Sequence, residues 1–200
     1  GCSGGILIRA LEKKGYKNVF GIDISKKAID LCKRRGIKNV YVMSGDKLKF
    51  KKKFDIIIAS DVLEHIKDDK KAVESMQQAL KKRGKVICFV PAFMSLWSNH
   101  DELNKHYRRY TIKDLVDVFT KNGFKVLRAS YWNASLFLPI LLGKKLFIKE
   151  KTNRNKHSHL YSHGRFINFV LFNTLILENY LLRVFNFSFG VSVFLIAKKI

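Results

Sequence analysis

The segment WSNHDELNKHYRRY, residues 97–110, contains an unusual density of ionisable and aromatic side chains. His106 can take a proton from a hydroxyl because an imidazole titrates near neutral pH. Arg109 can bind a carboxylate or a phosphate through two parallel N–H groups. We therefore predict that residues 92–110 form a lid over a small-molecule site, with His106 as a catalytic group. The residues expected to bind the acceptor molecule are His100, Arg109 and Tyr110. The alternative is that Arg109 and Tyr110 only anchor the lid to the following helix.

A second candidate for catalysis is His65, in the stretch FDIIIASDVLEHI at residues 54–66. The apolar run at 53–60 is typical of a strand that is buried on both faces of a parallel sheet. His65 should then lie near the carboxyl end of that strand, as a base or as a contact to the bound molecule. The alternative is that His65 braces the next helix.

The glycine cluster GCSGG at residues 1–5 predicts a turn whose backbone can approach a ligand closely. A helix follows directly, so its first amides point into the same space. Asp23 lies about 20 residues further on, at the end of the next expected strand, where an acid can accept hydrogen bonds from ribose hydroxyls. The second and third glycine positions of the dinucleotide pattern G-x-G-x-x-G hold Ser3 and Ile6, which argues against a nicotinamide dinucleotide.

Strand and helix patterns alternate at short intervals, which predicts an α/β fold with an open, doubly wound, mostly parallel sheet. The expected strands are 18–23, 39–44, 53–60, 85–91, 124–132 and 187–199. The expected helices are 6–14, 26–35, 68–80 and 111–122. We predict a single domain over residues 1–200, with the lid and a mostly helical insertion at 134–183. Ligands of such sheets bind beyond the carboxyl ends of the strands, where the loops named above should meet.

These motifs together resemble the class I S-adenosylmethionine-dependent methyltransferases, and in particular the branch that acts on small molecules, quinone precursors and glycan or lipid intermediates. The resemblance covers residue 1 to about residue 131, through GCSGG, GIDIS, SGDKLKF, FDIIIASDVLEHI and LKKRGKVICFVP. The stretch FSFGVSVFLIAKK resembles the antiparallel last strand of that Rossmann-like fold. In GCSGG, Ser3 replaces the middle glycine of the family's first motif.

The resemblance implies that the cofactor is S-adenosylmethionine. We predict no metal-binding residues. Asp23 would hold the ribose hydroxyls, Ile24 would lie against the adenine, and Asp46 would contact the adenine amino group. The full set of implied cofactor-binding residues is Gly1, Ser3, Gly5, Asp23, Ile24, Asp46, Ser60 and Asp61. The family's central first strand precedes the glycine loop, so we expect this sequence to be a fragment that lacks that strand.

The stretch SDVLEH stands where methyltransferases of base amines carry a [DNS]-P-P-[YF] motif, which argues against methylation of adenine or cytosine amines. The resemblance implies transfer of a methyl group to a hydroxyl of a small acceptor that is anionic or lipid-linked. An RNA methyltransferase is one alternative. A non-catalytic Rossmann-like module that binds anionic membranes is another.

The formal net charge of +23 favours an anionic partner, although a lysine-rich solvated surface would give the same composition. Three uncharged apolar stretches at 129–143, 166–177 and 184–197 are shorter than the ~20 residues that span a bilayer. They indicate core, an interface or peripheral membrane contact. Three scattered cysteines form neither a zinc spacing nor an even disulfide set, which favours a cytoplasmic protein.

Overall fold

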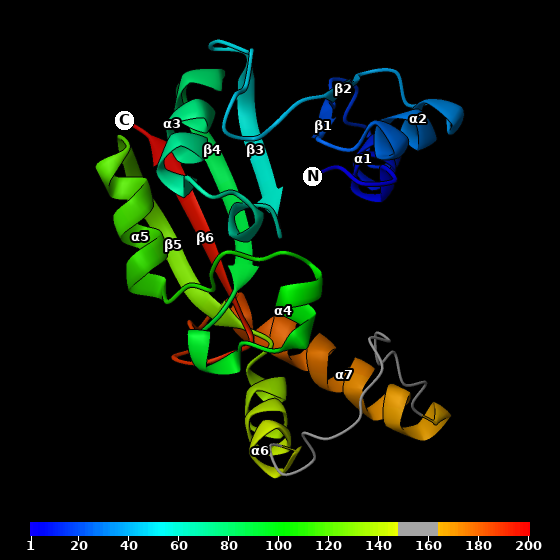
Figure 1. Cartoon of the computed structure of the whole chain (residues 1–200), viewed down its shortest axis with the longest axis vertical. Helices are drawn as coiled ribbons and strands as arrows, with labels where there is room; N and C mark the ends of the chain where they lie inside the picture. Colours follow the sequence, from blue (N-terminus) through cyan, green and yellow to red (C-terminus); the bar gives the residue numbers. More distant parts are fainter. Residues whose placement is uncertain (148–163) are drawn as a thin grey trace.

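A computed structural model describes residues 1–147 and 164–200 (Figure 1). The larger of its two sheets has the strand order β3-β4-β6-β5. These strands are β3 (Phe54–Ser60), β4 (Leu80–Pro91), β5 (Phe124–Trp132) and β6 (Ser192–Lys199). β3 and β4 are parallel, while β6 is antiparallel to both of its neighbours, β4 and β5. Three of the four strands therefore point the same way. This confirms the α/β class and the antiparallel last strand.

Two helices cover one face of this sheet, α3 (Asp69–Ala79) and α5 (Ile112–Lys121), which lie side by side in Figure 1. The main core lies between them and the strands, and its largest fully buried side chains include Tyr110, Phe119 and Phe124. The predicted start of α5 is confirmed, because Thr111 and Asp114 form a reciprocal capping box.

A smaller group at the N-terminal end contains β1 (Gly21–Asp23) and β2 (Val40–Val42), which pair in parallel as a two-stranded sheet. Its helices are α1 (Ile6–Lys13) and α2 (Lys26–Arg34), and Ser25 caps α2 as predicted by accepting a hydrogen bond from the amide of Ala28. A separate small core joins these elements through Ile8, Ile29, Cys32, Ile37 and Val40. β1 and β3 belong to different sheets. The expected strand ahead of residue 1 stays a prediction.

The expectation that β3 is buried on both faces is wrong. Ile56 and Ile58 are 51% and 37% exposed, whereas Ile57 and Ala59 pack into the main core. Successive side chains of a strand point to opposite faces. The face that carries Ile56 and Ile58 is not covered by α3 or α5, and β4 is the only sheet partner of β3 among the described residues.

Shorter helices follow the ends of β3 and β4. They are η1 (Leu63–His65), η2 (Met94–Leu96) and α4 (Asn99–Leu103). The backbone amide of Tyr107 donates to the carbonyl of Glu64 over 2.7 Å, and Tyr110 and Pro91 pair through their backbones over 2.9 Å. These bonds attach the segment at 92–110 to the carboxyl ends of β3 and β4.

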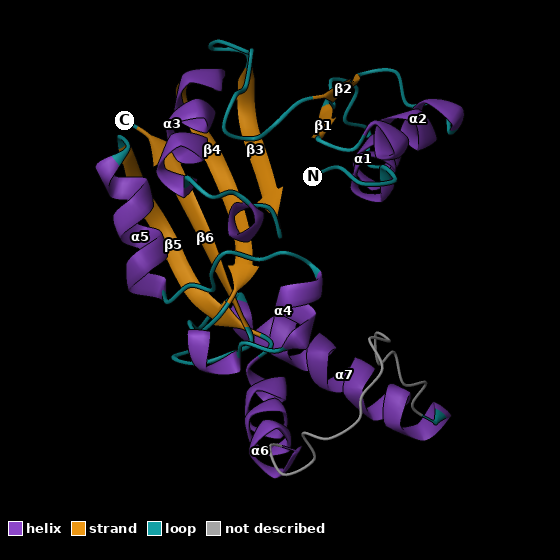
Figure 2. Ribbon diagram, in the orientation of Figure 1, coloured by secondary structure: helices purple, strands orange, loops and turns teal. Residues whose placement is uncertain are grey.

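The region predicted as a helical insertion begins with η3 (Ala134–Leu136) and α6 (Phe137–Phe147) and continues with α7 (Arg165–Leu182). The part at 148–163 lies outside the described residues. Figure 2 shows α6 and α7 extending beyond the end of the larger sheet. The carboxylate of Glu178, which is 5% exposed, accepts hydrogen bonds from the amides of Ala134 and Ser135 and so anchors α7 to η3.

Of the alternatives left open for this region, the exposure of α7 argues against packed core. The side chains of Phe166, Phe169 and Phe172 are 78%, 65% and 64% exposed, and Glu178 is the one buried residue among those of α7. Among the described residues, no helix is both long enough and apolar enough to cross a membrane.

Candidate active site

Asp23 ties the glycine loop to the end of β1. One of its carboxylate oxygens accepts a hydrogen bond from the amide of Ser3, and the other accepts from the amide of Ser25, each over 2.9 Å. The amide of Cys2 also donates to the carbonyl of Ile22 over 2.7 Å. Each carboxylate oxygen has two lone-pair directions. Asp23 therefore keeps acceptor capacity for the hydroxyls of a ribose, which is the fit that a nucleoside cofactor requires.

The glycine loop needs glycine at Gly5 for two reasons. Its φ of 79° lies in the left-handed region, and a Cβ atom there would stand 2.3 Å from the Ile37 side chain. Ser3 also has a positive φ, of 46°. The loop can thus turn sharply into α1 while Ser3 stays exposed. Gly1 opens the same loop, and its Cβ would stand 2.9 Å from the side chain of Val62.

The other expected cofactor contacts lie at the ends of the neighbouring strands. Ile24 follows β1 and is 74% exposed, and Asp46 follows β2 and accepts a short hydrogen bond from Ser44. Ser60 is the last residue of β3 and Asp61 follows it. Asp61 has a φ of 52°, and its amide donates to the carbonyl of Phe89. All four side chains are at least partly exposed, so they are accessible to a ligand. Their roles stay predictions.

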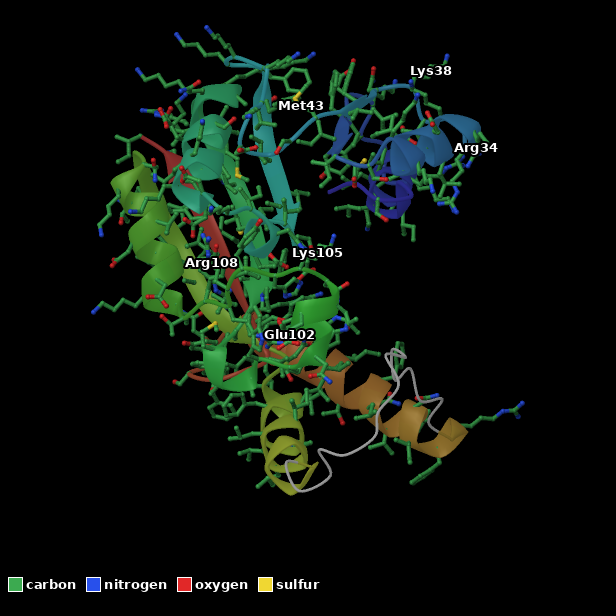
Figure 3. The ribbon with its side chains drawn as sticks, in the orientation of Figure 1. Arg34, Lys38, Met43, Glu102, Lys105 and Arg108 are labelled. Atoms are coloured by element: carbon green, nitrogen blue, oxygen red, sulfur yellow. The ribbon has the colours of Figure 1, made fainter. Side chains whose placement is uncertain are left out.

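Glu64, His65 and His106 form what we call the acid–histidine cluster. One ligand-type atom from each residue lies within 4.8 Å of the others. The two imidazole rings meet edge to face, with their centres 4.5 Å apart. Glu64 and His65 come from η1, directly after β3, and His106 comes from the lid. Figure 3 shows the neighbouring lid residues Glu102, Lys105 and Arg108 beyond the end of β3.

Asp101 fixes the orientation of His106. Its carboxylate, which is fully buried, lies 2.8 Å from Nδ1 of His106. Arg109 binds the same carboxylate with two nitrogens, at 2.8 and 2.9 Å. Burial alone would raise the pKa of Asp101, but hydrogen bonds from Arg109, Ser98 and His106 hold it well below its usual range. An ionised Asp101 selects the His106 tautomer with the proton on Nδ1, which leaves Nε2 as an acceptor.

Glu64 is the unusual member of the cluster. Its side chain is fully buried, and neither carboxylate oxygen has a hydrogen-bond partner among the described residues. Burial raises the pKa of Glu64 to about 8, with a smaller contribution from the charge of Asp61. Burial, followed by the nearby charge of His106, lowers the pKa of His65. Glu64 can therefore take up or release a proton close to neutral pH.

The residues predicted to bind the acceptor have other partners in this structure. Arg109 forms an ion pair with Asp101 and donates a hydrogen bond to the carbonyl of Ala92, and its side chain is 10% exposed. Tyr110 is 2% exposed and donates its hydroxyl proton to Asp69 over 2.9 Å. These contacts favour the alternative in which both residues anchor the lid. His100 is exposed and contacts Asn104, 6.4 Å from His106 between ring centres.

The sequence analysis assigned no role to Glu64 or Asp101. Each lies beside a histidine that was singled out, in LEH and in HDE. The sequence signal that could have identified the two acids is their position next to a histidine. Burial of the two acids, which gives them their chemical significance, depends on how the lid packs against η1.

Comparison with protein families places residues 1–88 in a family described as a methyltransferase domain. An uncharacterised protein of Methanocaldococcus jannaschii is 28% identical over 145 residues, which cover 68% of this chain and 69% of that protein. A ubiquinone biosynthesis O-methyltransferase of Pelagibacter ubique is 38% identical over 89 residues, covering 42% of this chain and 37% of that enzyme. The chain thus spans well under half the length of the enzyme it matches.

Solved structures with the same fold cover the whole chain. A putative methyltransferase of Haloferax volcanii, in complex with the activator Trm112, has a TM-score of 0.65 at 14% identity, and 80% of it is covered. A phosphoethanolamine N-methyltransferase of Haemonchus contortus with S-adenosylmethionine bound has a TM-score of 0.63 at 21% identity, with 47% covered. At these identities the likeness establishes the fold, which is Rossmann-like.

Proposed function

We propose that this chain, a class I S-adenosylmethionine-dependent methyltransferase, transfers a methyl group to a hydroxyl of a small acceptor. Bound S-adenosylmethionine supplies a methyl group that is already activated by the positive charge on its sulfur. The protein must therefore align the acceptor and favour loss of its proton. The observation that carries the proposal is the position of the acid–histidine cluster at the carboxyl end of β3.

On the cofactor side, Asp23 holds the ribose hydroxyls with the acceptor capacity that the loop amides leave free. Ile24 and Asp46 lie against the adenine. The glycine loop, with Gly1, Ser3 and Gly5, borders the amino-acid part, and Ser60 and Asp61 complete the site at the end of β3. These residues lie at or after the carboxyl ends of β1, β2 and β3, and ligands of this fold class bind at the carboxyl ends of strands.

On the acceptor side, the acid–histidine cluster favours the deprotonated form of a hydroxyl that reaches it. His65 and His106 are the residues that touch the acceptor oxygen. Nε2 of His106 is available because Asp101 occupies Nδ1. His100, at the exposed edge of the lid, contacts the rest of the acceptor. Arg109 and Tyr110 act indirectly, since their contacts hold the lid in position.

The acceptor is apolar or lipid-linked. Support comes from the exposed aromatic side chains of α7 and the exposed leucines of α6, which adjoin the lid end of the sheet. The net charge of +23 suits an acceptor that carries an anionic group or lies in an anionic membrane. The relative from Pelagibacter ubique, named as an O-methyltransferase of ubiquinone biosynthesis, supports a hydroxyl on an apolar molecule.

Methyl transfer from radiolabelled S-adenosylmethionine tests the proposal. We expect label in hydroxylated apolar acceptors, and much less in their methoxy analogues, whose oxygen has no proton to lose. His106→Ala should lower kcat strongly and leave cofactor affinity unchanged, while His100→Ala should affect mainly KM. Label that appears in RNA, with transfer to hydroxylated acceptors absent, would replace this function by RNA methylation.

A further inference from the structure

A buried carboxylate without a partner requires an explanation. Glu64 is fully buried and both of its oxygens lack hydrogen-bond partners among the described residues. Groups of this kind in folded proteins are paired, hydrogen-bonded or bound to a metal. The ring nitrogens of two histidines lie within 4.8 Å, and neither histidine donates a hydrogen bond to Glu64.

The surroundings of Glu64 match those of a metal ligand. Its carboxylate and the ring nitrogens of His65 and His106 lie within 4.8 Å of one another. Ligands about 2.0–2.2 Å from a tetrahedral ion stand roughly 3.5 Å apart, so a small rotation of side chains closes the site. His65 is exposed and can make this rotation. Residues from η1 and from the lid would then be joined through one ion.

The interaction of Asp101 with His106 supports the same assignment independently. In metal sites, a ligating histidine commonly donates its other ring N–H to a carboxylate, which fixes the tautomer and increases ligand basicity. Asp101 accepts from Nδ1 of His106 at 2.8 Å and is itself held by Arg109. This contact occupies Nδ1 of His106 and leaves Nε2 as the ring nitrogen that can bind a metal.

We propose that Glu64, His65 and His106 bind a divalent transition-metal ion, with Asp101 as the positioning residue behind His106. Two imidazoles and one carboxylate suit Zn²⁺, Co²⁺ or Mn²⁺, whereas Mg²⁺ and Ca²⁺ prefer sites made entirely of oxygen. Three protein ligands leave a position open, as in catalytic zinc sites.

The role of the ion rests on the proposed function. With the ion bound, His65 and Nε2 of His106 are ligands, so the acceptor hydroxyl contacts the ion and not the two imidazoles. An acceptor hydroxyl in the open position would lose its proton to water more readily, because the cation stabilises the alkoxide. The alkoxide oxygen then forms the bond to the methyl carbon as the carbon–sulfur bond breaks, and the electron pair of that bond stays on sulfur. No oxidant or reductant takes part. The ion remains on its three ligands throughout.

Metal binding is measured on the whole chain without cofactor or acceptor, so it does not depend on the reaction. Chelator-treated protein is titrated with Zn²⁺ by calorimetry and with Co²⁺ by visible absorption. We expect one Zn²⁺ per chain and a Co²⁺ spectrum without the near-ultraviolet band that thiolate ligands give. Mg²⁺ at the same concentrations should not compete. A thiolate band would place the ion on cysteines and overturn the proposal.

Variants identify the ligands. Glu64→Gln, His65→Ala and His106→Ala should each reduce Zn²⁺ affinity by more than the about 10–100-fold expected for the outer residue in Asp101→Asn. His100→Ala is the matched control, because this lid histidine contacts Asn104 and lies outside the cluster. The Zn²⁺ affinity of this variant should equal that of the natural chain. Circular dichroism of each variant checks that the chain folds. Equal affinities in Glu64→Gln, His106→Ala and His100→Ala would overturn the site.

The two proposals fail separately. The natural chain could bind zinc, and the cluster variants lose it, while no hydroxylated acceptor is methylated. This result would support the metal site and contradict the proposed function. Methyl transfer could instead proceed at full rate in chelator-treated protein, with no zinc bound at the cluster. This result would support the proposed function and contradict the metal site.

Discussion

Asp101 and Arg109 form the ion pair on which the orientation of His106 depends. The guanidinium contacts both carboxylate oxygens, and both side chains are at most 10% exposed. Each oxygen of the Asp101 carboxylate can accept more than one hydrogen bond. Asp101 can therefore accept from His106 as well as from the two nitrogens of Arg109. The orientation of His106 thus relies on Arg109 as well as on Asp101.

We predict that Arg109→Lys destabilises the protein by about 1–3 kcal/mol, because an ammonium cannot reproduce the two parallel hydrogen bonds to a buried carboxylate. The free energy of unfolding in urea measures this loss, with the exposed Arg83→Lys as control. Turnover should fall in Arg109→Lys as well, while cofactor affinity is unchanged. Loss of cofactor affinity with normal stability would contradict the anchoring role.

Glu64 predicts a pH dependence of stability in the metal-free protein. Burial raises its pKa to about 8 in the folded chain, above the value of an unfolded glutamate. Between about pH 4.5 and pH 8 the folded state therefore holds a proton that the unfolded state has lost. The contribution of this group is fully present below that range and disappears as the pH rises through it.

Urea unfolding of chelator-treated protein across this pH range is the measurement. The free energy of unfolding should decrease with pH more steeply in the natural chain than in Glu64→Gln, whose amide does not ionise. Identical slopes for the two proteins would mean that Glu64 is solvated or paired.

At the scale of elements, the capping box of α5 fixes where the lid ends and the helix begins. The hydroxyl of Thr111 accepts from the amide of Asp114, and the Asp114 carboxylate accepts from the amide of Thr111. Tyr110, next to the cap, is buried in the main core. The start of α5 and the last lid residue are therefore positioned together.

Thr111→Ala should reduce the free energy of unfolding by about 0.5–2 kcal/mol, since the side-chain acceptor of an N-cap is lost. Thr120→Ala near the other end of α5 is the control, because its hydroxyl bonds only to carbonyls one turn back. Thermal or urea unfolding compares the two. An equal effect of both substitutions would show that the cap is not a specific determinant.

Most elements were predictable because local patterns specify them. The strand at 124–132 was found at its observed bounds, and the helix predicted over 111–122 is α5 together with its two cap residues. The predictions that differ from the structure concern burial, because burial depends on tertiary contacts that a local sequence pattern does not specify. The apolar run of β3 indicated two buried faces, yet Ile56 and Ile58 are exposed, and α7 is apolar yet almost entirely exposed.

The acid–histidine cluster shows the same limit at the site. His65 and His106 were identified from their residue types and from the loops that hold them. Glu64 and Asp101 were not, because their importance arises from burial and from contacts between segments about 40 residues apart. Arg109 and Tyr110 were predicted to bind the acceptor, and their contacts favour the anchoring alternative that the sequence left open.

At the scale of the whole molecule, an apolar pair of helices extends from one end of a strongly basic body. Exposed side chains lie all around α7, including Phe166, Phe169, Phe172 and Tyr180. A bilayer surface can accommodate apolar groups on more than one side of a helix, and basic residues add attraction to anionic lipids. This arrangement would bring a lipid-linked acceptor to the lid.

We predict that the protein binds vesicles containing phosphatidylglycerol, and that salt weakens this binding. The double substitution Phe169→Asp and Phe172→Asp should abolish it, because two charges replace apolar side chains at the membrane surface. Tyr16→Asp, an equally exposed position near the other end of the molecule, is the control. Co-sedimentation with these vesicles measures the binding of the natural chain and of each variant. Loss of self-association in the double variant, with vesicle binding unchanged, would assign the surface to a second copy of the chain.

The central claim is that the carboxyl ends of β1 and β3 hold S-adenosylmethionine for methyl transfer, and Asp23 tests it most directly. Calorimetry with S-adenosylhomocysteine should show one site per chain. Asp23→Ala should weaken binding by about 1–3 kcal/mol, or roughly five- to 150-fold, because the ribose hydroxyls lose a charged acceptor. Asp55→Ala, an exposed acid at the opposite end of β3, should bind normally. Equal affinities for the two variants, or no binding by the natural chain, would contradict the account.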